Sequence, residues 1–142
     1  MDTNELKGKI RDLLKSPQLA SLATVTEDGK PWVRYLMSMG MDDLTIFMVT
    51  SLSSRKVAHI RAHPDVHVTM GGSAEHMDHP YVNIVATARI LDDAESKRKF
   101  WRDELKQYFS GPDDPDFCIL RIVPSVIEYL GPGMMEPLVY RP

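Results

Sequence analysis

Residues 49–60 bring hydroxyl groups and two cations together where a strand-like run gives way to a helical pattern. Ser53 or Ser54 can cap that helix, because a short hydroxyl side chain accepts a hydrogen bond from an unpaired backbone N–H. The first turn also offers free N–H groups and the positive end of the helix dipole. Arg55 and Lys56 add positive charge there, which is locally unfavourable unless an anion lies beside them. The pattern predicts a phosphate site, although a solvated serine-rich turn looks the same in sequence.

A third cation, Arg34, lies in an otherwise apolar stretch at residues 32–39. Burying an arginine in such a strand costs free energy unless an anion or a carboxylate pairs with it. Thr50 ends the next strand-like run, so adjacent strands can bring Arg34 and Thr50 to the start of the helix. Three cations with several hydroxyl and backbone donors suit a phosphate monoester, which carries nearly two negative charges.

The five histidines raise the question of a metal site. His59 and His63 are spaced i, i+4, and His76 and His79 lie in a loop, but no Cys partner or His-Glu-x-x-His signature accompanies them. The His59/His63 pair is better explained by a helix end, where histidines cap carbonyl groups. Nucleophile-elbow and Gly-x-Gly-x-x-Gly motifs are missing, and the paired aspartates fall in turns. We expect no metal site, and the sequence identifies no catalytic side chain.

The bulk composition limits the class of protein. The chain has 142 residues, of which 26% are charged and 43% hydrophobic, and its net charge is −3. These values are typical of one globular domain, residues 1–142, and argue against a nucleic-acid surface. The single cysteine, Cys118, excludes an intrachain disulfide and favours a cytoplasmic location. We expect neither a membrane span nor a signal peptide, because no apolar run approaches 18 residues.

Hydrophobic periodicity predicts the elements that position these residues. A stripe of Trp101, Leu105, Tyr108 and Phe109 indicates a long C-terminal helix, whose Lys97–Lys99 run is expected on the solvated face. Residues 131–137 cannot hold regular structure and need a surface to lie on, such as a second subunit. Helices are expected at residues 4–15, 54–62 and 94–109, and strands at 19–26, 32–39, 44–49, 66–70, 81–91, 117–123 and 126–130, the last two joined past a bulge.

Six or seven strands with helices outside them, in so short a chain, predict a closed antiparallel barrel. Closure removes the exposed strand edges that would otherwise pair with other molecules. The Asp-Gly turn at residues 27–30 predicts a hairpin between the first two strands. The third strand follows after another short turn, so the first three strands form a meander.

The motifs together resemble the pyridoxamine 5′-phosphate oxidase-like family of flavin-binding split barrels. Within that family they are most similar to the small bacterial branch of general stress proteins. The resemblance rests on the strand at residues 19–26 with its Asp-Gly-Lys-Pro turn, on Arg-Tyr-Leu-Met at residues 34–37, and on the Thr…Ser-Arg-Lys turn at residues 50–56. It covers residues 17–91 well and the C-terminal third loosely.

The resemblance implies a mainly β, six- to seven-stranded antiparallel split barrel with peripheral helices. It also implies a homodimer that binds FMN at the subunit interface, with tail residues of the partner covering the flavin. Arg55 and Lys56 would hold the FMN phosphate, and Arg34 would lie near the phosphate or the ribityl chain. The other implied cofactor contacts are Thr50 and Ser54 at the phosphate, Val49 beside them, the backbone of Tyr35, Leu36 and Met37 along the flavin, and Tyr81 at the ring edge.

The chain departs from the pyridoxamine phosphate oxidases on the substrate side. Met39 stands where those enzymes place a lysine for the substrate phosphate, and their C-terminal arginine motif is missing. We therefore interpret the chain as an FMN-binding flavoprotein and a flavin-dependent oxidoreductase of unknown substrate. Two alternatives stay open. One is a non-catalytic module that binds flavin or haem, and the His76/His79 loop is the feature that favours haem. The other is a deazaflavin-dependent reductase, because the basic cluster would bind that cofactor's phosphate equally well.

Overall fold

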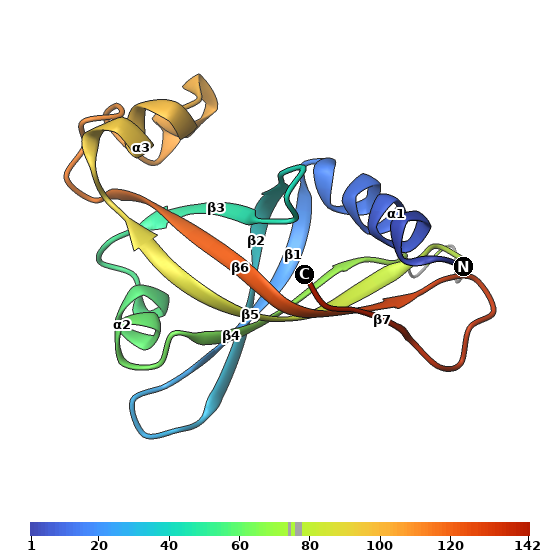
Figure 1. Ribbon diagram of the computed structural model, residues 1–142. Helices are drawn as coiled ribbons and strands as arrows, with labels where there is room; N and C mark the ends of the chain where they lie inside the picture. Colours follow the sequence, from blue (N-terminus) through green and yellow to red (C-terminus); the bar gives the residue numbers. More distant parts are fainter. Residues whose placement is uncertain (74, 76–77) are drawn as a thin grey trace.

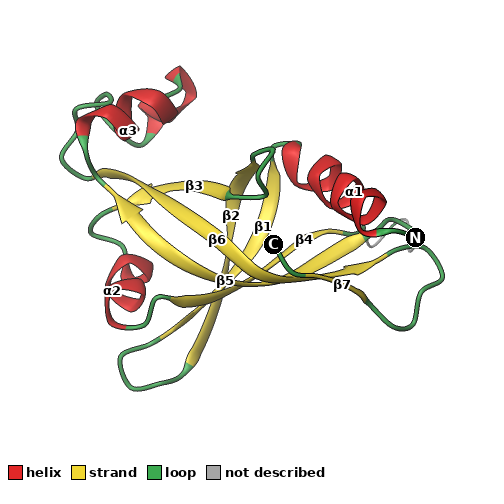
Figure 2. Ribbon diagram, viewed as in Figure 1, coloured by secondary structure: helices red, strands yellow, loops and turns green. Residues whose placement is uncertain are grey.

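The computed structural model describes residues 1–73, 75 and 78–142, and it forms a β-barrel with helices on the outside (Figure 1). Figure 2 shows how the strands make the body of the molecule while the helices lie at its edges. The elements in chain order are α1 (Thr3–Lys15), β1 (Gln18–Val25), β2 (Pro31–Gly40), β3 (Ile46–Ser51), α2 (Arg55–Ala62), β4 (Asp65–Gly71), β5 (Tyr81–Leu91), α3 (Ala94–Phe100), the 3-10 helix η1 (Asp103–Gln107), β6 (Phe117–Leu130) and β7 (Leu138–Tyr140).

The strands form one antiparallel sheet in the order β3-β2-β1-β4-β5-β6-β7. Pairing of β3 with β6 closes the first six strands into a barrel, and β7 is an extra strand on β6. The predicted closed antiparallel barrel is therefore confirmed. Alternation of the side chains turns one face of each strand inward, and consecutive pairings form a fully buried row of Leu22, Val68, Ile84 and Ile127.

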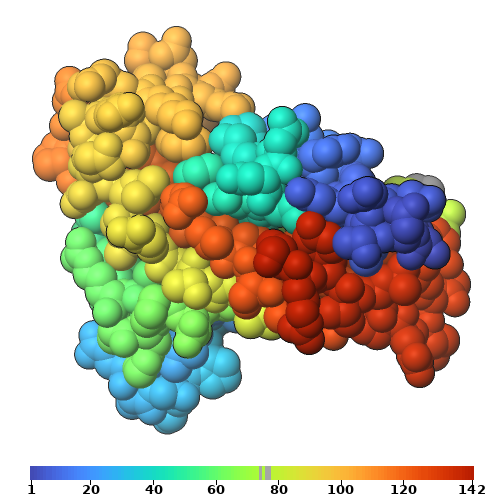
Figure 3. Space-filling view, viewed as in Figure 1, coloured from blue at the N-terminus to red at the C-terminus, as the bar shows by residue number. Residues whose placement is uncertain are grey.

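Helix α1 covers part of the barrel with its predicted apolar face, in which Leu6, Ile10 and Leu14 are buried. Its start is capped as the sequence indicates, because the Asp2 side chain accepts a hydrogen bond from Glu5 N at 2.8 Å. On another side of the molecule, the β1–β2 hairpin, α2 and the α3 segment lie one after another (Figure 3). That side carries the predicted basic residues at the start of α2.

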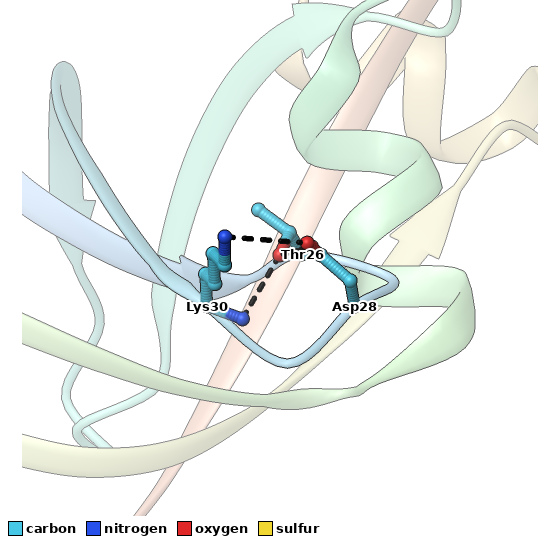
Figure 4. A network of polar contacts seen from close by, with 3 residues as sticks. All are labelled: Thr26, Asp28 and Lys30. Atoms are coloured by element: carbon cyan, nitrogen blue, oxygen red, sulfur yellow. Dashed lines mark hydrogen bonds and ion pairs between the residues drawn. The ribbon is translucent and has the colours of Figure 1, made fainter.

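The turn between β1 and β2 is the predicted hairpin. Gly29 has φ +84°, which glycine adopts without steric cost, and Thr26 N donates to Lys30 O at 2.8 Å. Figure 4 shows the side-chain contacts of this turn, in which Lys30 N donates to Thr26 Oγ1 at 2.9 Å and Lys30 Nζ lies 3.7 Å from Asp28 Oδ2. These contacts fix the register of β2 against β1, and thereby the place of Arg34.

The prediction of a single helix at residues 94–109 is wrong. Helix α3 ends at Phe100, Trp101 takes an extended conformation with ψ 138°, and η1 follows. The aromatic residues are shared between two surfaces: the Phe100 ring lies 4.4 Å from a phenylalanine of β3, whereas Trp101 and Phe109 pack 5.4 and 5.1 Å from Phe117. Trp101 and Phe109 therefore pack on Phe117 from outside one continuous helix, and Tyr108, which was expected in the buried stripe, is 73% exposed.

Two further expectations differ in detail. Lys97 was predicted on a solvated face but is buried, because its Nζ donates to Asp114 O at 2.8 Å. The third strand begins at Ile46 rather than at Leu44, which is buried with φ +71° in the preceding turn. The predicted bulge in the last long strand is confirmed by a register shift opposite Val85.

The tail after β6 lies on its own chain. Residues 131–137 have no helix or strand, as predicted, but Met134 packs against the core. The following residues return as β7, which pairs with Ile127–Tyr129 of β6. This part of the tail therefore packs on its own chain and does not need a second subunit to lie on.

Candidate functional site

The turn from β3 into α2 is held by the carboxylate of Asp116, at the start of β6. Ser53 N donates to Asp116 Oδ1 at 2.9 Å, the Ser51 hydroxyl donates to the same carboxylate, and Leu52 N donates to the Asp116 carbonyl oxygen at 2.7 Å. The hydrogen bonds from Ser51 and then Ser53 lower the pKa of Asp116. Sequence analysis did not single out Asp116, because its role depends on the pairing of β3 with β6.

Ser54 occupies the N-cap position of α2, but its side chain makes no capping hydrogen bond. Its Oγ is buried, and in the described part of the chain it has no hydrogen-bond partner. A buried hydroxyl without a partner costs free energy. The first turn of α2 also contains no acidic residue. A ligand group at this turn could supply the hydrogen-bond partner that the Ser54 hydroxyl lacks among the described residues.

Three cations converge beside Ser54. Arg34, Arg55 and Lys56 line a cavity of about 490 Å³, together with Trp32 and two serines. The Arg55 guanidinium lies 4.8 Å from the centre of the Trp32 ring, and Lys56 Nζ donates to Thr50 Oγ1 at 3.0 Å. The structure thus brings together the basic residues and hydroxyl groups that the sequence nominated.

The positive charge of this cluster has no counter-charge among the residues that the structure describes. Among the described residues, no carboxylate lies within ion-pair distance of Arg34, Arg55 or Lys56. Burial and then the charge of Arg34 lower the pKa of Lys56, and burial and then the charge of Arg55 lower the pKa of Arg34. A phosphate in the cavity would relieve this repulsion.

Arg34 is anchored by uncharged groups. Its Nη1 donates to Thr24 Oγ1 at 2.6 Å and to two backbone carbonyls of β1 and β2 at 3.2 and 3.3 Å, while Nη2 lies 3.5 Å from His59 Nδ1. The His59 ring is buried and its Nδ1 lies 2.8 Å from Thr24 Oγ1. The helix end expected from the His59/His63 pair is confirmed, because His63 is the C-cap of α2 and its N donates to His59 O at 2.7 Å, whereas the His59 side chain contacts Thr24 and not a carbonyl. Thr24 and His59 were not among the predicted site residues.

A larger cavity of about 850 Å³ lies between β2, β3 and the α3–η1 segment, and its wall is mainly apolar. Thr50 connects the two cavities, because it lines the larger one while its hydroxyl contacts Lys56 of the smaller one. Tyr81 begins β5 opposite Gly71 and Leu130 and lines neither cavity. Four other predicted cofactor residues line the larger cavity, namely Tyr35, Leu36, Met37 and Val49.

Met39 also lines the larger cavity, where its sulfur accepts a hydrogen bond from Arg102 Nη2 at 3.3 Å. Sequence analysis did not single out Arg102. Its position follows from the break after α3, which the periodicity of the segment does not reveal.

Within residues 1–73, 75 and 78–142, no three His, Cys, Asp or Glu side chains are placed to hold a metal ion. His76, on which the haem interpretation depends, lies outside those ranges. Within them, no helix has the length and apolar character needed to cross a bilayer.

Comparison with known proteins gives matches over nearly the whole chain. A family model described as pyridoxamine 5′-phosphate oxidase matches residues 6–131. General stress protein 26 of Bacillus subtilis (strain 168) is 37% identical over 138 residues, which are 97% of this chain and 97% of that protein. The crystal structure of General Stress Protein 26 from Bacillus anthracis str. Sterne has a TM-score of 0.82 at 30% identity, covering 97% of this chain and 99% of that one. A related protein from Clostridium acetobutylicum, with a TM-score of 0.81 at 20% identity and coverage of 99% and 96%, shows likeness of fold alone.

Proposed function

The chain belongs to the pyridoxamine 5′-phosphate oxidase family, and from this premise we propose that it is an FMN-binding flavoprotein. In this proposal it acts as an oxidoreductase on a substrate other than pyridoxamine phosphate. Met39 stands in place of the substrate-phosphate lysine expected from the resemblance, and its sulfur contacts Arg102 on the wall of the larger cavity.

The observation that carries the proposal is the Ser54 hydroxyl beside three cations, which among the described residues have neither a hydrogen-bond partner for the hydroxyl nor a counter-charge for the cations. A phosphate monoester accepts hydrogen bonds through three oxygens and carries nearly two negative charges. It would accept a hydrogen bond from Ser54 and neutralise Arg55 and Lys56. These features fit the phosphate end of FMN.

The adjoining larger cavity fits the other end of the cofactor. Its mainly apolar wall suits a planar aromatic ring, and Thr50 joins it to the basic cavity. When bound, the isoalloxazine supplies hydride or electron transfer. The residues of the chain bind the phosphate, line the ring and exclude water from it.

A second copy of the chain is part of the proposal. The outer apolar face, defined here as Leu19, Val33, Tyr35 and Met37 on β1 and β2, has side chains that are 60, 63, 74 and 57% exposed. Leu19, Tyr35 and Met37 also line the larger cavity, so a subunit seated on this face would cover the flavin. Tyr81 lies away from both cavities of its own chain, and in this arrangement its contact would be with the partner's cofactor.

The first test is an absorption spectrum after the purified protein has been mixed with FMN and desalted. Retained flavin bands with a shifted or structured envelope support the proposal, whereas a spectrum of protein alone contradicts it. Parallel titrations with a deazaflavin cofactor and with haem distinguish the alternatives on the same fold.

The second test replaces both cations at the start of α2. Because each charge-assisted hydrogen bond contributes about 1.5–3 kcal/mol, Arg55→Ala with Lys56→Ala should weaken FMN binding by at least about 3 kcal/mol. The fold should survive, since partly exposed cations add little to stability. Lys9→Ala with Arg11→Ala makes the same charge change on α1 and should leave the affinity unchanged. Equal FMN affinity in both double variants would contradict the assignment of the FMN phosphate to this cavity.

A further inference from the structure

Arg34 differs from the other two cations because side chains behind it hold its guanidinium. Nη1 donates to Thr24 Oγ1 at 2.6 Å, and that hydroxyl lies 2.8 Å from Nδ1 of the buried His59 ring. The direct contact between Arg34 Nη2 and His59 Nδ1, at 3.5 Å, is long and weak. The three side chains come from β2, β1 and α2, so they form a relay across three elements.

The donors and acceptors of this relay can be assigned from chemistry. A guanidinium only donates, so the Thr24 oxygen accepts from Arg34. Thr24 Oγ1 can either donate to His59 Nδ1 or accept from it, because a hydroxyl oxygen has two lone pairs. The contact of Arg34 Nη2 with the same Nδ1 decides between the two, because a guanidinium only donates and needs the lone pair of Nδ1. The ring proton then lies on Nε2, the imidazole is neutral, and Thr24 donates to Nδ1.

The neutrality of both partners matters for the ligand. A carboxylate would also hold Arg34 in place, but it would cancel the charge and compete with a phosphate. The hydroxyl and imidazole orient the guanidinium without neutralising it. They leave the Nε–H and one Nη2–H without a partner in the described part of the chain, and Arg34 lines the smaller cavity.

We propose that Thr24 and His59 are positioning residues, which hold the Arg34 guanidinium toward the anion cavity through the Nδ1 acceptor of His59. The inference rests on the proposed FMN site for its ligand, but the relay itself is a property of the chain. Loss of this relay should weaken binding of the phosphate half of the cofactor and leave binding of the flavin ring unchanged.

The test compares FMN with riboflavin, which lacks the phosphate. His59→Leu removes the acceptor, Thr24→Val removes the hydroxyl, and His59→Asn restores an acceptor oxygen near the Nδ1 position. His59→Leu and Thr24→Val should weaken FMN binding about tenfold, roughly the cost of ordering an arginine side chain, and riboflavin binding by less than about twofold. His59→Asn should recover most of the FMN affinity, and circular dichroism should show the wild-type fold in all three variants.

A second readout needs no flavin. Nitrogen NMR of the arginine side chains should show separate Nη signals for Arg34 in the wild type, as expected for a held guanidinium, and one averaged signal in His59→Leu. Equal losses for FMN and riboflavin, or no rescue by His59→Asn, would overturn the inference. If the wild type binds neither flavin, the proposed function fails, and the NMR signals still decide the inference: averaged Arg34 signals in the wild type would refute it.

Discussion

Ser54→Ala should change the stability of the protein and its affinity for FMN in opposite directions. At an ordinary N-cap, loss of a serine hydroxyl lowers the free energy of unfolding by about 0.5–2 kcal/mol, because the capping hydrogen bond is lost. Ser54 makes no such bond, and its buried Oγ has no partner among the residues described. In the flavin-free protein the substitution therefore breaks no hydrogen bond.

The size of both effects follows from that orphaned atom. Leaving a hydroxyl buried and unpaired costs about 1–3 kcal/mol, and alanine removes this cost while leaving a small void. We expect the free energy of unfolding of the flavin-free protein to stay level or to rise by up to about 1 kcal/mol. With FMN bound, the hydroxyl donates to a charged phosphate, a bond worth about 1.5–3 kcal/mol, so the Kd should rise at least about tenfold.

Urea unfolding of the flavin-free protein and a flavin-fluorescence titration measure the two effects. Ser125→Ala is the matched control, because Ser125 on β6 is exposed, lines neither cavity, and its hydroxyl donates to Val85 O at 3.1 Å. It should lower stability slightly and leave FMN affinity unchanged. A loss of about 1 kcal/mol or more in Ser54→Ala would show that its hydroxyl caps α2 in solution. Unchanged FMN affinity would show that Ser54 is not a phosphate ligand.

Two further outcomes test the dimer and the turn at the site. Val33→Glu should convert a dimer to a monomer in light scattering, because it puts a charge into the outer apolar face, whereas Val123→Glu on β6, three strands from β1 in the sheet, should not. Asp116→Asn should lower the free energy of unfolding in urea at neutral pH but not in acid. Hydrogen bonds from Ser51 and then Ser53 lower the pKa of Asp116 in the folded state, so its contribution is complete above the ordinary pKa of 3.8 and is lost as the pH falls through the lowered value. If the difference in unfolding free energy between the wild type and Asp116→Asn did not change with pH, the stabilising role of the Asp116 carboxylate would be contradicted.

The fold was predictable where burial alternates strictly along a strand. Residues 81–91 alternate so clearly that the predicted bounds of β5 are those observed. The break after Phe100 was not predictable, because the aromatic residues that follow keep a helical spacing in the sequence. The contacts of Trp101 and Phe109 with Phe117 in β6 come from tertiary packing that the local period does not encode.

The site was predictable where its residues are close in sequence or lie on neighbouring strands. Ser54, Arg55 and Lys56 share one turn, and β2 and β3 are joined by a short connection. The supporting residues depend on register instead. Asp116 reaches the Ser53 turn across 63 residues, and His59 reaches β1 across 35. No pattern within either segment specifies which strand it will face.

The arrangement of charge explains why these supporting groups have the chemistry they do. Burial and then the charge of Arg34 lower the pKa of Lys56, and a carboxylate beside Lys56 would offset both and stabilise the ligand-free protein. It would also weaken phosphate binding by occupying the same donors. In the described chain, the acid of this region is Asp116, and it is directed to Ser51 and Ser53, while Arg34 is held by a hydroxyl. The site thus keeps its donors in place and its positive charge uncompensated, which favours a bound phosphate over any internal ion pair.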